Sequence, residues 1–432
     1  MESLSIIILL LSFFTLLLVG VPVAYSVGVS TTITLLCSIL TMPAITTVAQ
    51  RMATAMDSFT LLAIPFFVLA GQLMNRGGIA NRLIDFAKAL VGWIPGGLAF
   101  VNIVSNMLFG SISGSAVASA TAIGGIMGDR MKEEGYDEGF SAAVNITSAT
   151  TGLIIPPSNV LIVYSLASGG ASIAALFLAG YIPGLLLGVS LMLVAGYKAY
   201  KAGYKSSERV SFSESGRLFV RAIPSLLLLV IVIGGIVGGF FTATEASAIA
   251  VVYTFILSVV VYKEVKVKEL KQVFLDTAVT TSIVLFLVAT SMAMSWMLSF
   301  ENIPQQVSAA LLSLSDNKIV ILLLINVILL VVGVFMDITP AILIFTPIFL
   351  PVVVAQGIDP VHFGIVMVMN LCVGLCTPPV GTLLFVGCSV ADLPLSKVIK
   401  PILPFFMAML VTLLLTTYWP AVSMWLPTVL GY

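Results

Sequence analysis

The chain has 432 residues, of which 59% are hydrophobic and 9% are charged, and its formal net charge is zero. With a mean hydropathy of +1.17, this composition excludes a soluble globular protein and indicates a polytopic all-α membrane protein. A charged ligand must then be bound by local dipoles or single residues, because there is no global field. No glycine-rich phosphate loop, His-Glu zinc pattern or nucleophile elbow is present, so we do not expect an enzyme that hydrolyses ATP.

Because a membrane span needs about 20 apolar residues, the apolar segments predict roughly ten full spans and two shorter paired segments. The first segment, residues 4–19, lacks a basic leader and a convincing cleavage site, and another apolar stretch follows at once. We therefore expect a retained first span rather than a signal peptide.

The positions of the basic residues predict the topology. Seventeen of the 19 lie in five connections, around residues 76–88, 130–132, 198–221, 263–271 and 397–400. Short loops rich in Lys and Arg face the cytoplasm, so an even number of crossings separates neighbouring connections. Residues 97–128 must then enter and leave on the cytoplasmic side as a re-entrant hairpin. By the same argument, residues 319–351 form a hairpin on the opposite side.

A helix-breaking element occurs twice, as Gly152-Leu153-Ile154-Ile155-Pro156-Pro157 and, 222 residues later, as Gly374-Leu375-Cys376-Thr377-Pro378-Pro379. In each half, the sequence predicts three spans, an amphipathic stretch (79–91 or 304–314), a hairpin, a broken span and a final span. Five crossings per half is an odd number, so the second half is expected to be inverted. The predicted organisation is a first repeat (1–197) with a broken span at 140–168, a linker (198–217) with several serines, and a second repeat (218–432) with a broken span at 361–388.

The two breaks are candidate ion sites. A proline cannot donate to the carbonyl four residues earlier, so the proline pairs should free the carbonyls of Gly152, Leu153, Gly374 and Leu375. Within a membrane, free carbonyls are tolerated only where they face protein or a wet cavity. Oxygen atoms from such turns suit a hard monovalent cation.

Hairpin one carries many small hydroxyl and glycine residues between Ser105 and Ser115, and we expect a non-helical tip at residues 110–115 that exposes backbone groups toward the first break. Close helix packing through small residues is the alternative. Hairpin two carries Asp337, and an ionisable group at this depth is by default a functional hypothesis. A capping role for Asp337, with Pro340 early in the returning helix, is compatible with it.

The half-helices that resume after the breaks start near Ser158-Asn159 and Gly381-Thr382. Their N-terminal ends carry partial positive charge and unpaired N–H donors, so together they could bind a carboxylate without a buried Arg or Lys. Simple capping by Ser158 and Asn159 is the alternative.

Four further features have structural explanations that compete with functional ones. Cys372 and Cys376 share a helical face and serve as small apolar fillers more readily than as a metal pair. The single histidine, His362, is expected in a short connection, as a loop or interface residue or else a proton relay. Glu245 is expected to cap a helix rather than take part in transport. The amphipathic stretches are either interfacial arms or ordinary connecting helices.

Taken together, these segments resemble the large membrane subunit of the tripartite ATP-independent periplasmic (TRAP) transporters. The resemblance covers nearly the whole chain and rests on residues 62–71, 110–116, 155–158, 242–246 and 336–340. One departure is Ala243, where the family tends to have proline, and it affects only the local turn.

The resemblance implies a sodium-driven importer of the elevator type, of the ion-transporter superfamily, in the bacterial inner membrane. Its expected partners are a small four-span membrane subunit, a soluble periplasmic substrate-binding protein and the lipid bilayer, with no nucleic acid. The expected substrate is an organic anion such as a C4-dicarboxylate, a keto acid or a sialic acid. The basic loops place both termini in the periplasm. Alternatives are a related two-hairpin dicarboxylate carrier without a binding protein, a passive channel and an intramembrane enzyme.

By the same resemblance, one Na⁺ lies between each hairpin and its own break. The expected sodium ligands are Ser105, Asn106, Gly110, Ser113, Gly152, Leu153, Gly333, Asp337, Thr339, Gly374, Leu375 and Thr377. The expected substrate-binding residues are Ser111, Ser115, Ser158, Asn159, Asp337 and Thr382.

Overall fold

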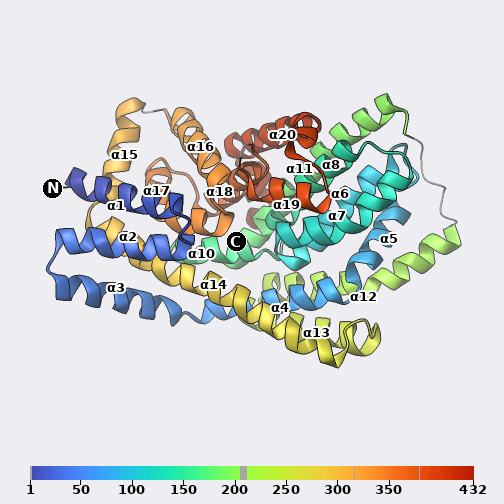
Figure 1. Cartoon of the computed structure of the whole chain (residues 1–432), viewed down its shortest axis with the longest axis horizontal. Helices are drawn as coiled ribbons and strands as arrows, with labels where there is room; N and C mark the ends of the chain where they lie inside the picture. The colour runs from blue at the N-terminus through green and yellow to red at the C-terminus, as the bar shows by residue number, and fades with distance from the viewer. Residues whose placement is uncertain (1, 205–211, 316, 379) are drawn as a thin grey trace.

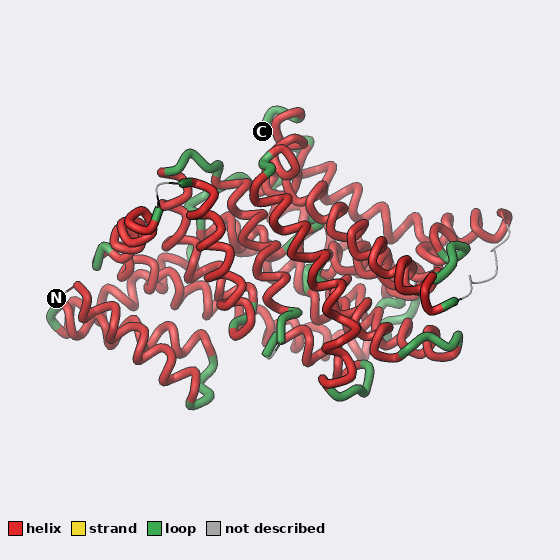
Figure 2. The backbone as a smooth tube through the Cα atoms, turned by 90° about the horizontal axis from the view of Figure 1, so that it is seen from above, coloured by secondary structure: helices red, strands yellow, loops and turns green. Residues whose placement is uncertain are grey.

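The computed structural model describes residues 2–204, 212–315, 317–378 and 380–432. Within these ranges the chain consists of helices joined by short loops, with no strand (Figure 2). The prediction of an all-α polytopic membrane protein is confirmed. The described residues leave out Lys205, Ser206, Ser207, Arg209 and Ser211 of the predicted linker, and Pro379 of the second break.

The helices of the first half are α1 (Glu2–Leu18), α2 (Val23–Ser38), α3 (Thr41–Met56), η1 (Phe59–Leu62), α4 (Ala63–Arg76), α5 (Ile79–Val91), α6 (Gly97–Ser113), α7 (Ala116–Glu133), α8 (Glu138–Ala149), α9 (Thr151–Ile154), α10 (Asn159–Ala167) and α11 (Ile173–Ala202). Those of the second half are α12 (Phe212–Val237), α13 (Ala243–Phe255), η2 (Ile256–Val261), α14 (Val267–Phe300), α15 (Ile303–Leu314), α16 (Lys318–Phe335), α17 (Ile338–Ala355), α18 (Pro360–Leu375), α19 (Thr382–Val390), α20 (Leu395–Tyr418) and α21 (Ala421–Val429).

Fewer helices reach spanning length than the roughly ten predicted. In the described chain, eight helices are long and apolar enough to cross a membrane, and the pair formed by residues 138–154 and 159–167, bent by 50°, makes a ninth. The helices α1, α2 and α18 are apolar but shorter. At 1.5 Å per residue, the 16 residues of α2 extend about 24 Å, less than the roughly 30 Å of a hydrocarbon core.

The helices fall into two groups, which we call outer and inner. The outer group comprises residues 2–76 and 212–300, and in it α14 packs against α2, α3 and α4, while α4 packs against α13. Figure 1 shows α3, α4, α13 and α14 along the lower edge of the molecule. The inner group comprises residues 97–202 and 318–418, and it contains both hairpins and both broken spans. The amphipathic helix α5 contacts α6 and α12, and α15 contacts α14 and α17.

Each hairpin is pressed against its own broken span by a pair of glycines. A Cβ atom on Gly110 would lie 2.8 Å from Cα of Gly152, and a Cβ atom on Gly374 would lie 2.6 Å from Cα of Gly333. Side chains cannot come this close, so glycine is required at both contacts.

The predicted non-helical tip of hairpin one, residues 110–115, is wrong over most of its length. The helix α6 continues through Ser113 and ends at Gly114, whose φ of 63° permits the left-handed C-cap. The Gly114 N–H donates to the Gly110 carbonyl. Gly110 therefore serves close packing, which was the alternative interpretation, and only Gly114 and Ser115 lie outside the helices.

The linker boundaries and the role of Glu245 also follow from helix ends. Lys198 and Lys201, which were assigned to the linker, belong to α11, and Arg217 belongs to α12. Glu245 forms a capping box with Thr242 at the start of α13, which confirms its predicted capping role.

Candidate functional site

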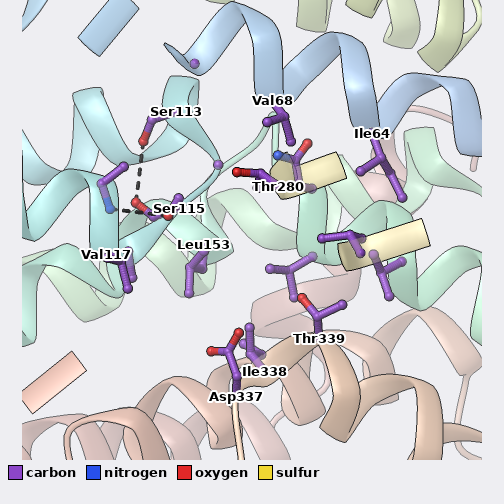
Figure 3. A pocket seen from close by; sticks show the side chains of 18 of the residues that line it. Ile64, Val68, Ser113, Ser115, Val117, Leu153, Thr280, Asp337, Ile338 and Thr339 are labelled. Atoms are coloured by element: carbon purple, nitrogen blue, oxygen red, sulfur yellow. Dashed lines mark hydrogen bonds between the residues drawn. The ribbon is translucent and has the colours of Figure 1, made fainter. Parts of the chain in front are cut away.

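A cavity of about 250 Å³ lies where the tips of the two hairpins meet the two broken spans. Its inner wall comes from residues 113–118 of hairpin one, residues 337–339 of hairpin two, and side chains on both sides of each break. Its outer wall comes from α4 and α14. Figure 3 shows Asp337 and Thr339 on one side of the open space and Ser115 on the other.

Four helix N-termini converge on this cavity. The helices α7, α10, α17 and α19 all begin at its wall, and residues of the first turn of each line it. The first N–H groups of a helix have no partner within the helix, and the helix dipole adds partial positive charge at this end. Among the described residues that line the cavity, there is no Lys or Arg. The arrangement suits an anion bound by backbone dipoles.

Asp337 is the single charged residue among the described lining residues. It occupies the N-cap position of α17, yet its side chain makes no capping hydrogen bond. The residue is solvent-exposed although it lies deep within the fold, because its side chain faces the cavity. A carboxylate in this place can coordinate a cation, and it would repel an anion bound directly against it.

The hydroxyls at the cavity differ in what they bond. The Ser115 Oγ accepts from the Ala118 N–H at 3.2 Å and so caps α7. The Thr382 Oγ1 is buried and has no hydrogen-bond partner within the described chain. Thr382 therefore has a hydroxyl that a ligand could bond, and the hydroxyls of Thr280 and Thr339 at the same cavity also make no hydrogen bond within the described chain.

The breaks are less open than predicted, because local donors replace the missing helix bonds. The Ser158 Oγ donates to the Leu153 carbonyl at 2.5 Å instead of capping α10. The Thr377 N–H donates to the Gly374 carbonyl at 2.9 Å. Two of the four carbonyls that were expected to be free thus have a protein donor in this conformation.

About half of the predicted site residues meet at the cavity. Those that line it are Ser113, Ser115, Leu153, Asn159, Asp337, Thr339, Leu375 and Thr382. Those that do not line it are Ser105, Asn106, Gly110, Ser111, Gly152, Ser158, Gly333, Gly374 and Thr377.

Asn106 belongs to a buried polar cluster that joins hairpin one to α8. Its amide nitrogen donates to Asn102 Oδ1 at 2.7 Å and to Ser148 Oγ at 2.9 Å, and its Oδ1 accepts from Ser119 Oγ at 2.6 Å. The neighbouring Ser105 Oγ is buried without a partner within the described chain. A ligand role thus fits Ser105 better than Asn106, whose polar atoms are already bonded.

Sequence reasoning missed the outer wall of the cavity. Gln72 and Asn75 on α4, and Thr280 on α14, line it. The signal that could have indicated Gln72 and Asn75 is two amide side chains, three residues apart on one helical face of an otherwise apolar span. Nothing in the local sequence distinguishes Thr280 from other hydroxyls of α14.

The prediction that His362 lies in a short connection is wrong, because Asp359 caps α18 and Pro360 occupies its first turn. His362 is buried, with its Nδ1 2.7 Å from the Ser423 Oγ of α21, so it lies at a helix interface. Cys372 and Cys376 are buried and free. Within the described residues, no group of three His, Cys, Asp or Glu could hold a metal ion.

Two hairpins and two broken helices around one cavity are an arrangement that many secondary transporters share. Residues 10–422 match the family described as the tripartite ATP-independent periplasmic transporter, DctM component. The chain belongs to this family, which is a family of transport permeases and not of enzymes.

The chain aligns with three relatives over nearly the full length of both sequences. The chain is 55% identical to the uncharacterized protein YgiK of Salmonella typhimurium over 98% of this chain and 97% of YgiK. It is 41% identical to the C4-dicarboxylate TRAP transporter large permease protein DctM of Pseudomonas aeruginosa, over 94% of each chain. It is 39% identical to the sialic acid TRAP transporter large permease protein SiaM of Vibrio cholerae, over 96% of this chain and 97% of SiaM.

The fold also resembles a solved transporter structure. The YdaH transporter of Alcanivorax borkumensis superimposes with a TM-score of 0.65 at 14% sequence identity, covering 87% of this chain and 88% of that one. At this identity the likeness concerns the fold alone.

Proposed function

We propose that this chain is the permease of a sodium-coupled importer that carries an organic anion, which a periplasmic substrate-binding protein delivers. The observation that carries the proposal is the convergence of four helix N-termini on one cavity without Lys or Arg among its described lining residues. Such a cavity favours a small anion while keeping its binding weak enough for release.

The relatives support the same class of substrate. By their names, one relative transports C4-dicarboxylates and another transports sialic acid, and both substrates are carboxylates at neutral pH. We therefore propose a C4-dicarboxylate, a keto acid or a sialic acid as the substrate of this chain.

Two observations favour sodium as the coupling ion. Each hairpin packs closely against its own break, so carbonyl and hydroxyl oxygens of both lie near one another. The unpartnered Ser105 Oγ in hairpin one and the accessible carboxylate of Asp337 in hairpin two are hard oxygen donors of the kind Na⁺ takes.

The two helix groups fit an elevator mechanism in which the inner group carries the cavity past the outer group, with α5 and α15 as connecting arms. In this proposal the transporter lies in the bacterial inner membrane with both termini in the periplasm. The tripartite family implies two partners, a small four-span membrane subunit and the periplasmic binding protein. In the isethionate relative of Oleidesulfovibrio alaskensis, the name DctMQ indicates a single longer chain.

The proposal is tested in proteoliposomes that contain this chain with its small subunit and receive the binding protein from outside. Labelled succinate, pyruvate and sialic acid are tried in turn, with Na⁺ or with K⁺ as the external cation. We expect saturable uptake of at least one anion that an inward Na⁺ gradient drives and that K⁺ does not support.

Uptake that is equal in Na⁺ and K⁺ would contradict the coupling. Uptake by this chain alone, without either partner, would instead support the related carrier that needs no binding protein. Flux that does not saturate and never accumulates substrate would indicate a channel.

A further inference from the structure

An ion pair joins the two helices that form the outer wall of the cavity. The Arg76 Nη2 on α4 donates to the Asp276 Oδ2 on α14 at 2.5 Å. The other oxygen of that carboxylate, Oδ1, accepts from the Gln272 Nε2 at 2.7 Å. The Arg76 and Asp276 side chains are 35% and 33% exposed, so about a third of each side chain lies at the surface of this chain.

The pair lies within one helical turn of residues that line the cavity, on the side of the basic loops. Arg76 follows Asn75, which lines the cavity, and Asp276 lies one helical turn before Thr280, which lines it from α14. Arg76 is the last residue of α4, and α14 begins only nine residues before Asp276, just after a loop with two lysines. A solute that moves from the cavity toward the basic loops along α4 and α14 therefore meets this pair.

A purely structural role accounts poorly for the pair. The helices α4 and α14 already pack against each other, and an ion pair with this much exposure adds little to stability. Arg76 also has capacity to spare, because a guanidinium has five N–H donors and the described structure engages one of them with Asp276. Asp276 shows directly which chemistry Arg76 recognises, since its bound partner is a carboxylate.

We propose that Arg76 is a substrate-positioning residue that binds a carboxylate of the transported anion as it passes between the cavity and the side of the basic loops, and that Asp276 competes for the same guanidinium. This inference rests on the proposed function, because it requires an organic anion as substrate. Asp276 holds Arg76 while no substrate is present, the substrate carboxylate displaces it, and rebinding by Asp276 releases the substrate. The competition keeps affinity low on this side, as import requires.

The competition predicts opposite effects for the two partners. Asp276→Asn frees Arg76, so the half-saturating concentration of substrate on the side of the basic loops should fall about 3-fold. Arg76→Gln removes the guanidinium donors that bind the substrate carboxylate, so the same concentration should rise about 3-fold. A structural link would instead be broken equally by both changes, and both would shift the concentration in the same direction.

The experiment uses proteoliposomes that contain the full complex. Binding protein added outside activates only those molecules whose binding-protein side faces outward, so the lumen samples the other side. Exchange of external labelled substrate is then measured against increasing substrate inside. The probe is the first of succinate, pyruvate and sialic acid that the wild-type complex takes up. Arg76→Lys serves as a second variant, which retains charge but loses the planar fork and should give an intermediate shift.

The matched controls are Arg130→Gln and Asp85→Asn. This pair lies 3.8 Å apart, its side chains are 40% and 44% exposed, and neither residue lines the cavity. In both controls, the half-saturating concentration of internal substrate should equal that of the wild type. If this concentration is the same in wild type, Asp276→Asn, Arg76→Gln and Arg76→Lys, the role of Arg76 is overturned and the transport proposal stands. Failure of the wild-type complex to take up any of the three anions would overturn the proposed function, and the role of Arg76 with it.

Discussion

The hydroxyl of Thr382 makes no hydrogen bond within the described residues that would stabilise the fold. Its Oγ1 is buried at the first turn of α19 without a partner within the described chain, and the residue lines the cavity. A buried polar group without a partner costs free energy, whereas an apolar group of the same shape does not. The hydroxyl is therefore explained by a ligand that it meets only during transport.

Replacing this hydroxyl should separate binding from stability. We expect Thr382→Val to raise the half-saturating substrate concentration by at least about tenfold, since a hydrogen bond to a charged group contributes about 1.5–3 kcal/mol. The free energy of unfolding should stay the same or rise by about 1 kcal/mol. Transport assays and thermal unfolding of the purified complex measure the two quantities.

A suitable control is Thr254→Val in the outer group, where the Oγ1 is bonded to carbonyls of its own helix at 2.7 and 3.1 Å. This control should leave the half-saturating concentration unchanged. A Thr382→Val variant that melts well below wild type while it binds substrate normally would show that the hydroxyl serves the fold instead.

At the scale of helices, the contact between hairpin one and its broken span depends on two glycines. A Cβ atom on Gly152 would overlap the backbone of Gly110. Because overpacking typically costs about 1–3 kcal/mol, we expect Gly152→Ala to lower thermal stability and to push α6 away from α9. Thermal unfolding of the complex, with limited proteolysis of the loop between α7 and α8, measures the change.

The matched control is Gly125→Ala on α7. A Cβ atom at this glycine meets no other atom within 4 Å. Alanine in an exposed helix is favoured over glycine by about 0.5–1 kcal/mol, so this variant should melt at or above the wild-type temperature. Similar melting temperatures for both variants would refute the close contact.

The sequence predicts features that depend on neighbouring residues, and it misses features that depend on contacts between distant ones. Hairpin one was predicted at 97–128 and hairpin two at 319–351, and the helix pairs span 97–133 and 318–355, because hydropathy and glycine or proline breaks act locally. The hydrogen bond from the Ser158 hydroxyl to the Leu153 carbonyl was not predicted. A side-chain donor can replace a lost backbone donor without any change in the pattern of apolar and helix-breaking residues. The outer wall was missed because α4 and α14 are brought together by packing between residues about 200 positions apart.

For the molecule as a whole, the outer and inner groups meet at a tight contact beside the cavity. A Cβ atom on Gly71 of α4 would lie 3.4 Å from Cα of Ser113 at the tip of hairpin one. In an elevator this contact must break in every cycle. We expect a disulfide between Gly71→Cys and Ser113→Cys, in a background without other cysteines, to abolish transport, and a reducing agent to restore it to the level of the unlinked double variant.

A disulfide within the outer group supplies the control. A Cβ atom on Gly28 of α2 would lie 3.0 Å from Cγ2 of Thr290 on α14, so Gly28→Cys with Thr290→Cys can be linked in the same way. Transport should survive this second link. An importer that works at full rate with Gly71 and Ser113 linked would contradict relative motion of the two groups at this contact.

Two contacts within the inner group join positions that are 222 residues apart, the same distance that separates the two helix breaks. The Thr412 Oγ1 donates to the Ser190 Oγ at 3.0 Å, and the Cys372 Sγ approaches the Thr150 carbonyl at 3.8 Å. A position meets its own counterpart only where a two-fold axis passes between them. If the two halves are inverted repeats, as the sequence predicts, a chain of half this length would make both contacts with an identical copy of itself inserted the other way up, and the junction would have the form of a homodimer interface.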